Sequence, residues 1–313
     1  MIAGRGPGFH GAMRILSFNI QNLRLRRSGG TPRLDGARDR DETGESPALD
    51  PADRRLAATL LARAGADLVI LQEVFDTATL SWFNTHHLAR AGLAPYPFEQ
   101  CLPGNDGRGL GLAVLARRVP RLTSHAQLTA RNLGLDAPDP DQPVFRRDCL
   151  MVEIGALTVF GCHFKAPYPD PAAAWAVRRR EAEAVRRLVE HSFAGQDAPL
   201  WLIAGDLNEP WSADPDPAIA PLLAPFSTDL MARLPEGDRW TFHDHHAGRY
   251  AQPDALLASP ALAAKWPNAV PKVLRAGLAF EATRYKGEHL PGVGRHRPHA
   301  SDHAAVMIDL PAC

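Results

Sequence analysis

Short apolar runs that end in polar residues recur along this chain, and they constrain its fold more than any other feature. The clearest run, Leu200–Ala204, is apolar throughout, as expected of a buried strand, and leads into Gly205-Asp206-Leu207-Asn208. Side chains alternate along an extended chain, so Asp206 and Asn208 leave the strand tip on the same side. A polar pair at the end of a rigid strand indicates the border of a pocket.

Predicted strands outnumber predicted helices, which favours two packed sheets with helices outside them. Strands are predicted at Ile15–Ile20, Leu68–Leu71, Leu110–Ala116, Arg121–Leu128, Arg147–Ile154, Leu157–Cys162, Leu200–Ala204, Tyr250–Ala258 (interrupted by Pro253), Lys272–Arg275 and Ala304–Leu310. Helices are predicted at Asp53–Ala64, with Asp53 as the cap, at Thr77–Ala91 and at Pro171–Ser192. So few helices argue against a regular βαβ barrel.

Polar segments join these elements. Arg24–Asp53 is long for a connection and rich in Gly, Pro and both charge signs, so we expect a solvated, disordered or functional rim loop. We expect the run Arg178-Arg179-Arg180 to face solvent. Met1–Ala12 is Gly-rich and lacks the apolar core of a secretory signal. We expect residues 1–12 to be a disordered tail or an over-assigned start, and residues 13–313 to form one domain.

Composition excludes several classes of function. Lys plus Arg and Asp plus Glu each number 35 among 313 residues, so net charge gives no general attraction to nucleic acid or to anionic membranes. No apolar run approaches the length that spans a bilayer. The four cysteines, Cys101, Cys149, Cys162 and Cys313, lack the spacing of disulfide frameworks or zinc sites. We therefore expect a cytoplasmic protein without a membrane span.

Acids, amides and histidines follow the predicted strands at several separate places. The set comprises Asn19, Gln21, Glu73, His163, Lys165, Asp206, Asn208, Asp254, Asp302 and His303. Mg²⁺ and Mn²⁺ prefer oxygen ligands, usually one or two carboxylates together with water and substrate oxygens. A phosphate beside the metal needs neutral or cationic donors, which Asn and His side chains provide. The pattern indicates metal-assisted chemistry on a phosphate ester.

Six short motifs carry a resemblance to a known family. They are Ser17-Phe18-Asn19, Leu71-Gln72-Glu73-Val74, Cys162-His163-Phe164-Lys165, Gly205-Asp206-Leu207-Asn208, Pro253-Asp254 and Ser301-Asp302-His303. Taken singly, each has an ordinary structural explanation, such as a turn, a helix cap or a buried histidine. Together and in this order, they resemble the endonuclease/exonuclease/phosphatase superfamily. His163 is similar to the second histidine of its deoxyribonuclease and sphingomyelinase branches.

The resemblance implies an α/β four-layer sandwich, two packed mixed β-sheets flanked by helices, and metal-dependent hydrolysis of a phosphoester. It implies that Glu73 is the principal ligand of Mg²⁺ or Mn²⁺, with Asn19 and Asp302 beside it. It implies that Asp206 orients and deprotonates the attacking water and that Asn208 donates to the phosphate. It also implies that His303, held by Asp254, contacts the phosphate and that His163 faces the phosphoryl group.

The remaining basic residues and histidines each have two interpretations. Lys165 and Arg147 are predicted substrate contacts, with a solvated loop as the alternative for Lys165 and a surface pair with Arg146 for Arg147. A further set of histidines suggests zinc: His243, His245, His246, His289, His296 and His299. No cysteines stand at zinc-finger spacing, so we expect these histidines to be solvated in loops.

Two classes of function stay open, and the sequence does not determine the substrate, the number of metal ions or the oligomeric state. The first is a phosphodiesterase acting on nucleic acid or, alternatively, on a lipid or small ester as a sphingomyelinase does. The second is a catalytically silent binding module on the same scaffold. The intact set of Glu73, Asp206, Asn208, Asp302 and His303 argues against the second class.

Overall fold

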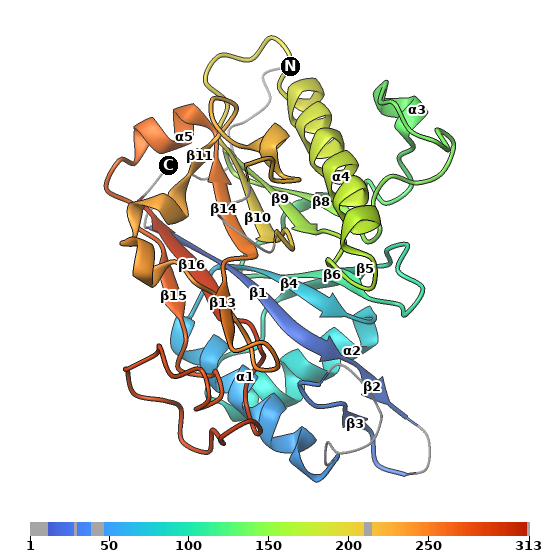
Figure 1. Ribbon diagram of the computed structural model, residues 1–313. Helices are drawn as coiled ribbons and strands as arrows, with labels where there is room; N and C mark the ends of the chain where they lie inside the picture. The colour runs from blue at the N-terminus through green and yellow to red at the C-terminus, as the bar shows by residue number, and fades with distance from the viewer. Residues whose placement is uncertain (1–11, 28–29, 39–46, 210–214, 312–313) are drawn as a thin grey trace.

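Two β-sheets pack face to face between outer helices in the computed structural model, which describes residues 12–27, 30–38, 47–209 and 215–311 (Figure 1). This arrangement confirms the predicted four-layer α/β sandwich. The predicted tail, residues 1–12, lies outside the described residues apart from Ala12. In the described part of the chain, no helix has the combined length and apolar character needed to cross a membrane.

Each large sheet mixes parallel and antiparallel strands. In spatial order, the first sheet is β15 (Lys272–Leu274), β16 (Ala305–Leu310), β1 (Met13–Leu23), β4 (Leu68–Val74), β6 (Gly111–Ala116) and β5 (Phe98–Leu102). The second is β11 (Thr228–Asp229), β14 (Asp254–Ala258), β10 (Trp201–Asp206), β9 (Leu157–His163), β8 (Cys149–Ile154) and β7 (Arg121–Thr123). Two ribbons pair β2 (Leu25–Arg26) with β3 (Arg33–Leu34) and β12 (Phe242–Asp244) with β13 (Arg249–Ala251). The central pairs β1–β4 and β9–β10 are parallel.

Helices cover the outer faces of both sheets. They are α1 (Asp50–Ala64), α2 (Thr77–Trp82), the π-helical turn η2 (Phe83–Leu88), α3 (Ala130–Leu133), α4 (Pro171–Ser192) and α5 (Pro260–Lys265). Short 3₁₀ turns are η1 (Pro47–Leu49), η3 (Ala220–Leu222), η4 (Leu230–Arg233) and η5 (Glu236–Asp238). In Figure 1, α4 lies beside β8–β10 in the upper half, and α1 and α2 lie below β1 and β4.

The strands are apolar on both faces because each sheet is covered on both sides. In β1, Ile15 belongs to the core between the sheets, whereas Leu16 packs in the core that α1 shares. In β10, Leu202 faces the other sheet and Ile203 packs in the core beneath α4. These neighbouring residues have no exposed surface. The continuous apolar runs of the sequence therefore follow from the layered architecture.

The start of α1 differs from its prediction. The helix begins at Asp50, and Asp53 is buried in its first turn instead of acting as the cap. The Asp53 carboxylate accepts hydrogen bonds from the backbone N–H groups of Ala37 (2.9 Å) and His299 (3.0 Å) and pairs with Arg297. Residues 34–38 are also buried, so this part of the predicted solvated loop is packed against the helix.

Helix α4 has its predicted bounds, but its arginine run does not lie wholly on a solvated face. Arg178 is buried and donates from Nη1 to the carbonyl oxygen of Lys165 (3.2 Å). It shares a buried stripe at helical spacing with Ala174, Glu181 and Val185. Arg178 is buried because its position in the helix places it on this buried stripe, although its neighbours in the arginine run are also charged.

Other bounds also differ from their predictions. The helix predicted over Thr77–Ala91 changes to a π-helical turn after Trp82. Strand β7 ends at Thr123, so residues 124–128 of that prediction are not extended in the sheet. The predicted interruption at Pro253 is confirmed, because this residue, which lacks a backbone donor, separates β13 from β14.

Candidate active site

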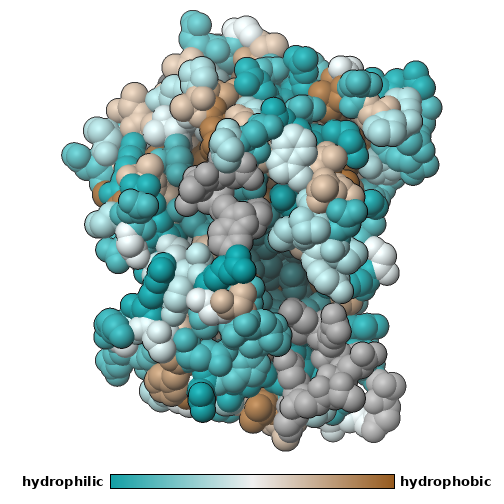
Figure 2. Space-filling model, in the orientation of Figure 1, coloured by the Kyte–Doolittle hydropathy of each residue, from teal (hydrophilic) through white to brown (hydrophobic). Residues whose placement is uncertain are grey.

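Strand pairing brings the predicted polar residues to one end of the two packed sheets. In the second sheet, Asp206 lies opposite His163 in the parallel pair β9–β10 and opposite Asp254 in the antiparallel pair β10–β14. In the first sheet, Asn19 ends the regular pairing of β1 with β4, next to Glu73. Figure 2 shows a mostly hydrophilic surface that is hollowed near the middle of the view.

The carboxylates of Glu73 and Asp206 meet around the side chains of Asn19 and His163. Asn19 Nδ2 donates to Glu73 Oε1 (3.3 Å) and to Asp206 Oδ2 (3.0 Å), while its Oδ1 accepts from the backbone N–H of Gln21 (3.0 Å). His163 Nε2 lies 3.9 Å from Glu73 Oε1 and 3.6 Å from Asp206 Oδ2. Asn19 thus turns its amide nitrogen, rather than its oxygen, toward the two acids.

Four residues around this cluster hold backbone conformations that are unusual for side chains other than glycine. The φ angles are 54° at Gln21, 52° at Asn22, 65° at Glu73 and 52° at Asn208. The bends aim functional groups: the Asn22 N–H donates to Glu73 Oε2 (2.9 Å), and the Asn208 N–H donates to Asp206 Oδ1 (2.9 Å). Each such conformation costs about 1–3 kcal/mol and persists where surrounding structure enforces it, often at functional sites.

On the other side of Asp206, a histidine is held by a buried acid. His303 Nδ1 lies 2.8 Å from Asp254 Oδ2, and His303 Nε2 lies 3.9 Å from Asp206 Oδ2. The Thr241 hydroxyl donates to the same Asp254 oxygen (2.6 Å). The ring of Phe242 packs against the imidazole, with the ring centroids 4.9 Å apart. His303 is therefore fixed with Nε2 directed toward Asp206.

Burial and neighbouring charges move the pKa values at the site in different directions. Burial raises the pKa of Asp206 to about 6, although His303 acts to lower it. Burial alone lowers the pKa of His303, but the carboxylates of Asp254 and Asp206 outweigh it and raise that pKa well above its usual value. Burial, then Arg147 and His303, lower the pKa of His163 well below its usual value. At neutral pH, the site holds an ionised Asp206, a charged His303 and a neutral His163.

Asp302 and Asn208 lie at the margins of the cluster. The backbone N–H of Asp302 donates to Gln21 Oε1 (3.2 Å), and the neighbouring Ser301 hydroxyl donates to the carbonyl of Asn19 (2.7 Å). The Asn208 side chain donates from Nδ2 to the carbonyl of Phe164 (3.1 Å). Both residues are half-buried, so each keeps exposed surface beside the acids.

Lys165 and Arg147 have protein partners in this structure. The Lys165 ammonium donates to the carbonyls of Ala166 (2.8 Å) and Tyr168 within its own loop. Arg147 is buried, not half of a surface pair as the sequence suggested. It donates from Nη1 to the carbonyl of Phe164 (2.8 Å), and its Nη2 lies 3.2 Å from Asp106 Oδ2. Both residues support the segment that follows His163.

Two supporting residues were missed by sequence reasoning. Glu181 is buried and accepts hydrogen bonds from the backbone N–H groups of Arg146 (2.9 Å) and Lys165 (2.8 Å). Its position on the buried stripe of α4 is a signal that could have identified it. Thr241, which binds Asp254, gives no such signal, because a single threonine beside a short strand is common.

The donor chemistry at Glu73 fits a hard divalent cation. Two carboxylates, of Glu73 and Asp206, crowd one amide nitrogen, and a third carboxylate, of Asp254, lies close to His303. The Oδ1 atom of Asp254 is buried without a hydrogen-bond partner. Carboxylate oxygens at this density repel one another unless positive charge is nearby, and they are the ligands that Mg²⁺ and Mn²⁺ prefer.

An α/β sandwich that gathers acids, an amide and imidazoles at its strand ends fits a class of hydrolases. A model of the Endonuclease/Exonuclease/phosphatase family matches residues 16–303, and the chain belongs to this family, as predicted. Family membership supports a phosphoester hydrolase. No curated protein matches the chain.

Solved structures share this fold at low sequence identity. Truncated TDP2 from Caenorhabditis elegans has a TM-score of 0.59 and 15% identity, covering 96% of this chain and 97% of that one. TDP2 from D. rerio, in complex with a single-strand DNA product, has a TM-score of 0.56 and 16% identity, covering 95% and 98%. An endonuclease/exonuclease/phosphatase family protein from Leptotrichia buccalis has a TM-score of 0.57 and 13% identity, covering 96% and 99%.

Proposed function

We propose that the protein is a divalent-metal-dependent phosphodiesterase that activates water through Asp206. The observation that carries this proposal is the convergence of Asp206 with Glu73, His163 and His303, each with a side-chain atom within 4 Å of another member. These residues come from four separate segments of the chain, and their contacts need the fold to form. A structural role alone does not require ionisable groups to crowd in this way.

The protein side chains supply a base, a cation and oriented donors. Asp206 is ionised at neutral pH, and the amide of Asn19 and the N–H of Asn208 fix its two oxygens. It is the group that takes a proton from the attacking water. His303 carries positive charge next to Asp206 and is suited to a phosphate oxygen. Asp254 holds its ring and in turn accepts a hydrogen bond from Thr241.

Glu73 is the proposed principal ligand for Mg²⁺ or Mn²⁺, with Asp302 beside it. When bound, the cation would neutralise charge on the phosphate and stabilise the charge that develops during displacement. Asn19, predicted to lie beside this ligand, is also proposed to position the site. Its Nδ2 faces Glu73 and Asp206, so it positions the two acids relative to each other.

Nucleic acid is the proposed substrate, with a lipid or small phosphodiester as the alternative. The family and the shared fold with TDP2, one structure of which contains a single-strand DNA product, support this choice. A cytoplasmic location is proposed from composition alone.

A chromogenic phosphodiester assay tests the proposed chemistry. We expect hydrolysis in Mg²⁺ or Mn²⁺ that EDTA abolishes and that returns when the metal is restored. Glu73→Gln should raise the metal concentration needed for half-maximal rate, whereas His191→Ala, an exposed change in the last turn of α4, should not. Absence of EDTA-sensitive activity would instead support the silent binding module.

A substrate screen then distinguishes nucleic acid from the alternatives. The same preparation is offered plasmid, single-stranded DNA, RNA, sphingomyelin and phosphoinositides. Cleavage of a polynucleotide should weaken steeply with added salt, because binding a polyanion releases counterions. Hydrolysis of sphingomyelin alone, with little dependence on salt, would favour the lipid phosphodiesterase.

A further inference from the structure

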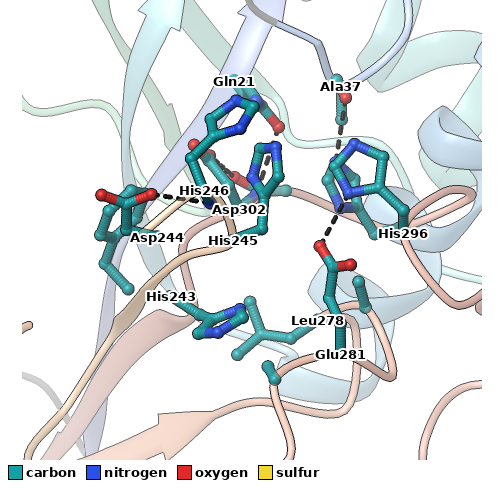
Figure 3. Close-up of a pocket in the computed structure, with 15 residues that line it drawn as sticks. Gln21, Ala37, His243, Asp244, His245, His246, Leu278, Glu281, His296 and Asp302 are labelled. Carbon is teal, nitrogen blue, oxygen red and sulfur yellow. Dashed lines mark hydrogen bonds and ion pairs between the residues drawn. The ribbon is translucent and has the colours of Figure 1, made fainter. Parts of the chain in front are cut away.

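Beside the proposed active site lies a cavity lined by imidazoles that the proposed chemistry does not use. Its volume is about 240 Å³, and its lining includes His243, His245, His246, His296 and His299. Figure 3 shows the side chains of His243, His245, His246 and His296 around the cavity, together with Glu281. The sequence suggested solvated loops for them, but His299 is buried and His243 and His296 are half-buried.

Three of the lining residues present ligand atoms to one another. Atoms of His245, Glu281 and His296 all lie within 4.8 Å of one another. His296 Nδ1 is 2.7 Å from Glu281 Oε1, and the rings of His245 and His296 have centroids 4.4 Å apart. Ligand atoms around a bound zinc ion lie about 3.3 Å apart, given metal–ligand distances of ~2.0–2.1 Å. His245 is exposed and Glu281 and His296 are half-buried, so these side chains have room to rotate toward that spacing.

The backbone holds two of these residues next to each other. The N–H of Glu281 donates to the carbonyl of Arg295 (3.0 Å), and the N–H of Phe280 donates to the carbonyl of Gly294 (3.0 Å). Arg297, which follows His296, is anchored by the buried carboxylates of Asp50 and Asp53. Glu281 and His296 are therefore fixed side by side on a packed loop.

The third residue comes from the ribbon formed by β12 and β13. His245 follows β12, in a turn where Asp244 Oδ1 accepts from the N–H groups of His246 (3.0 Å) and Ala247 (3.0 Å). The turn brings the rings of His245 and His246 to 3.8 Å between centroids.

We propose that His245, Glu281 and His296 form a binding site for a zinc-class divalent transition-metal ion, separate from the Mg²⁺ or Mn²⁺ site at Glu73. Two imidazoles and one carboxylate are a ligand set for zinc and its neighbours in the first transition row, whereas Mg²⁺ prefers oxygen alone. Three protein ligands leave a coordination position open, and the cavity lies beside them. Asp302 and Gln21 line the same cavity, so the two sites are neighbours.

Co²⁺ binding to untagged protein tests this site without an activity measurement. The background is Glu73→Gln, which weakens the other proposed metal site. We expect this variant to bind one Co²⁺ ion with visible absorption typical of nitrogen ligands. Adding His245→Ala, His296→Ala or Glu281→Gln should weaken that binding by at least about tenfold, whereas adding His191→Ala should not.

Two results would overturn the proposal. The first is no Co²⁺ or Zn²⁺ binding by Glu73→Gln protein at micromolar metal, which would leave His296 and Glu281 as a plain ion pair. The second is unchanged binding in both His245→Ala and Glu281→Gln backgrounds. His245 is exposed and Glu281→Gln preserves size, so circular dichroism should show both variants folded. The phosphodiesterase proposal does not depend on either result.

Discussion

Asp206 and His303 illustrate how a buried contact sets the chemistry of single residues. Each group is removed from water, which by itself favours the neutral forms of both. His303 Nε2 lies 3.9 Å from Asp206 Oδ2, and the Asp254 carboxylate adds a second negative charge next to the imidazole. The two carboxylates raise the pKa of His303 by more than burial lowers it. At neutral pH, His303 therefore keeps its proton while Asp206 is ionised.

Replacing the base is the first prediction at the residue scale. Asp206→Asn should lower kcat about 10²–10⁴-fold, the range typical of losing a positioned general base. The amide keeps the volume of the carboxylate, so the thermal midpoint should stay close to wild type. Single-turnover hydrolysis of a chromogenic diester measures the change, and a wild-type rate in folded Asp206→Asn would refute the assigned role.

The pH dependence of the rate gives a second prediction. The base must be ionised, so kcat/KM should fall as the pH drops through about 6, or lower when a bound cation depresses the pKa of Asp206. Charged His303 is lost as the pH rises through its raised pKa. Asp254→Asn removes a carboxylate that raises this pKa, so the alkaline limb should move to lower pH.

Profiles of wild type and Asp254→Asn at one metal concentration test this shift. The acid limb gives a second readout, because Asp254 also acts to raise the pKa of Asp206. The acid limb should therefore shift slightly to lower pH in the variant. An alkaline limb that stays in place would show that His303 does not act as the cation.

At the scale of elements, a buried ionic cluster fastens α1 to distant loops. Asp50 and Asp53 in the first turn pair with Arg297, and Asp50 also pairs with Arg38 at 3.1 Å. Arg54 has no exposed surface and donates to the carbonyls of Ile20 (2.7 Å) and Gln21 (2.6 Å). The cluster therefore supports the strained end of β1 that carries the candidate site.

Breaking this cluster should be costly. Asp53→Ala leaves two backbone N–H groups buried without their acceptor and removes one of the two carboxylates that pair with the buried Arg297, so the free energy of unfolding should fall by about 3–5 kcal/mol. Glu183→Ala is the matched control, since it removes an exposed ion pair with Arg179 (3.5 Å) worth about 0–1 kcal/mol. Urea unfolding followed by circular dichroism measures both, and equal small losses would contradict a structural role for the cluster.

At the scale of the whole molecule, the two sheets approach closely where a glycine faces an isoleucine. A Cβ atom at Gly161 in β9 would lie 2.9 Å from Cγ2 of Ile70 in β4, closer than packed carbons tolerate. β4 belongs to the first sheet and β9 to the second. The same two strands carry Glu73 and His163 at their C-terminal ends, so the spacing of the sheets also sets the spacing of the site.

Filling this contact gives the prediction for the whole molecule. Gly161→Ala should lower the free energy of unfolding by about 1–3 kcal/mol through overpacking. Ile70→Ala removes the opposing atoms, so the double variant should lose about 0.5–3 kcal/mol less than the sum of the single variants. Additive losses in urea unfolding would show that the two residues do not meet across the sheets.

Local sequence patterns by themselves determined most of the strands in the two large sheets, the long helix and the family. An apolar run predicts a buried strand because the burial of a strand is recorded in its own residues. The bounds of α4 are likewise recorded in its own residues, and they match the prediction. The six ordered motifs predicted the family, which the match over residues 16–303 confirms. The individual roles of the site residues and the single domain over 13–313 stay predictions.

Only the tertiary structure decided which polar residues meet. Asn19 and Asp206 are 187 residues apart in sequence, and their 3.0 Å contact depends on strand register and sheet packing. The burial of Arg147 and the meeting of His245 with Glu281 likewise depend on segments distant along the chain. The periodicity of a sequence segment predicts the structure of that one element. It contains no information on how separate elements pack, and these contacts depend on that packing.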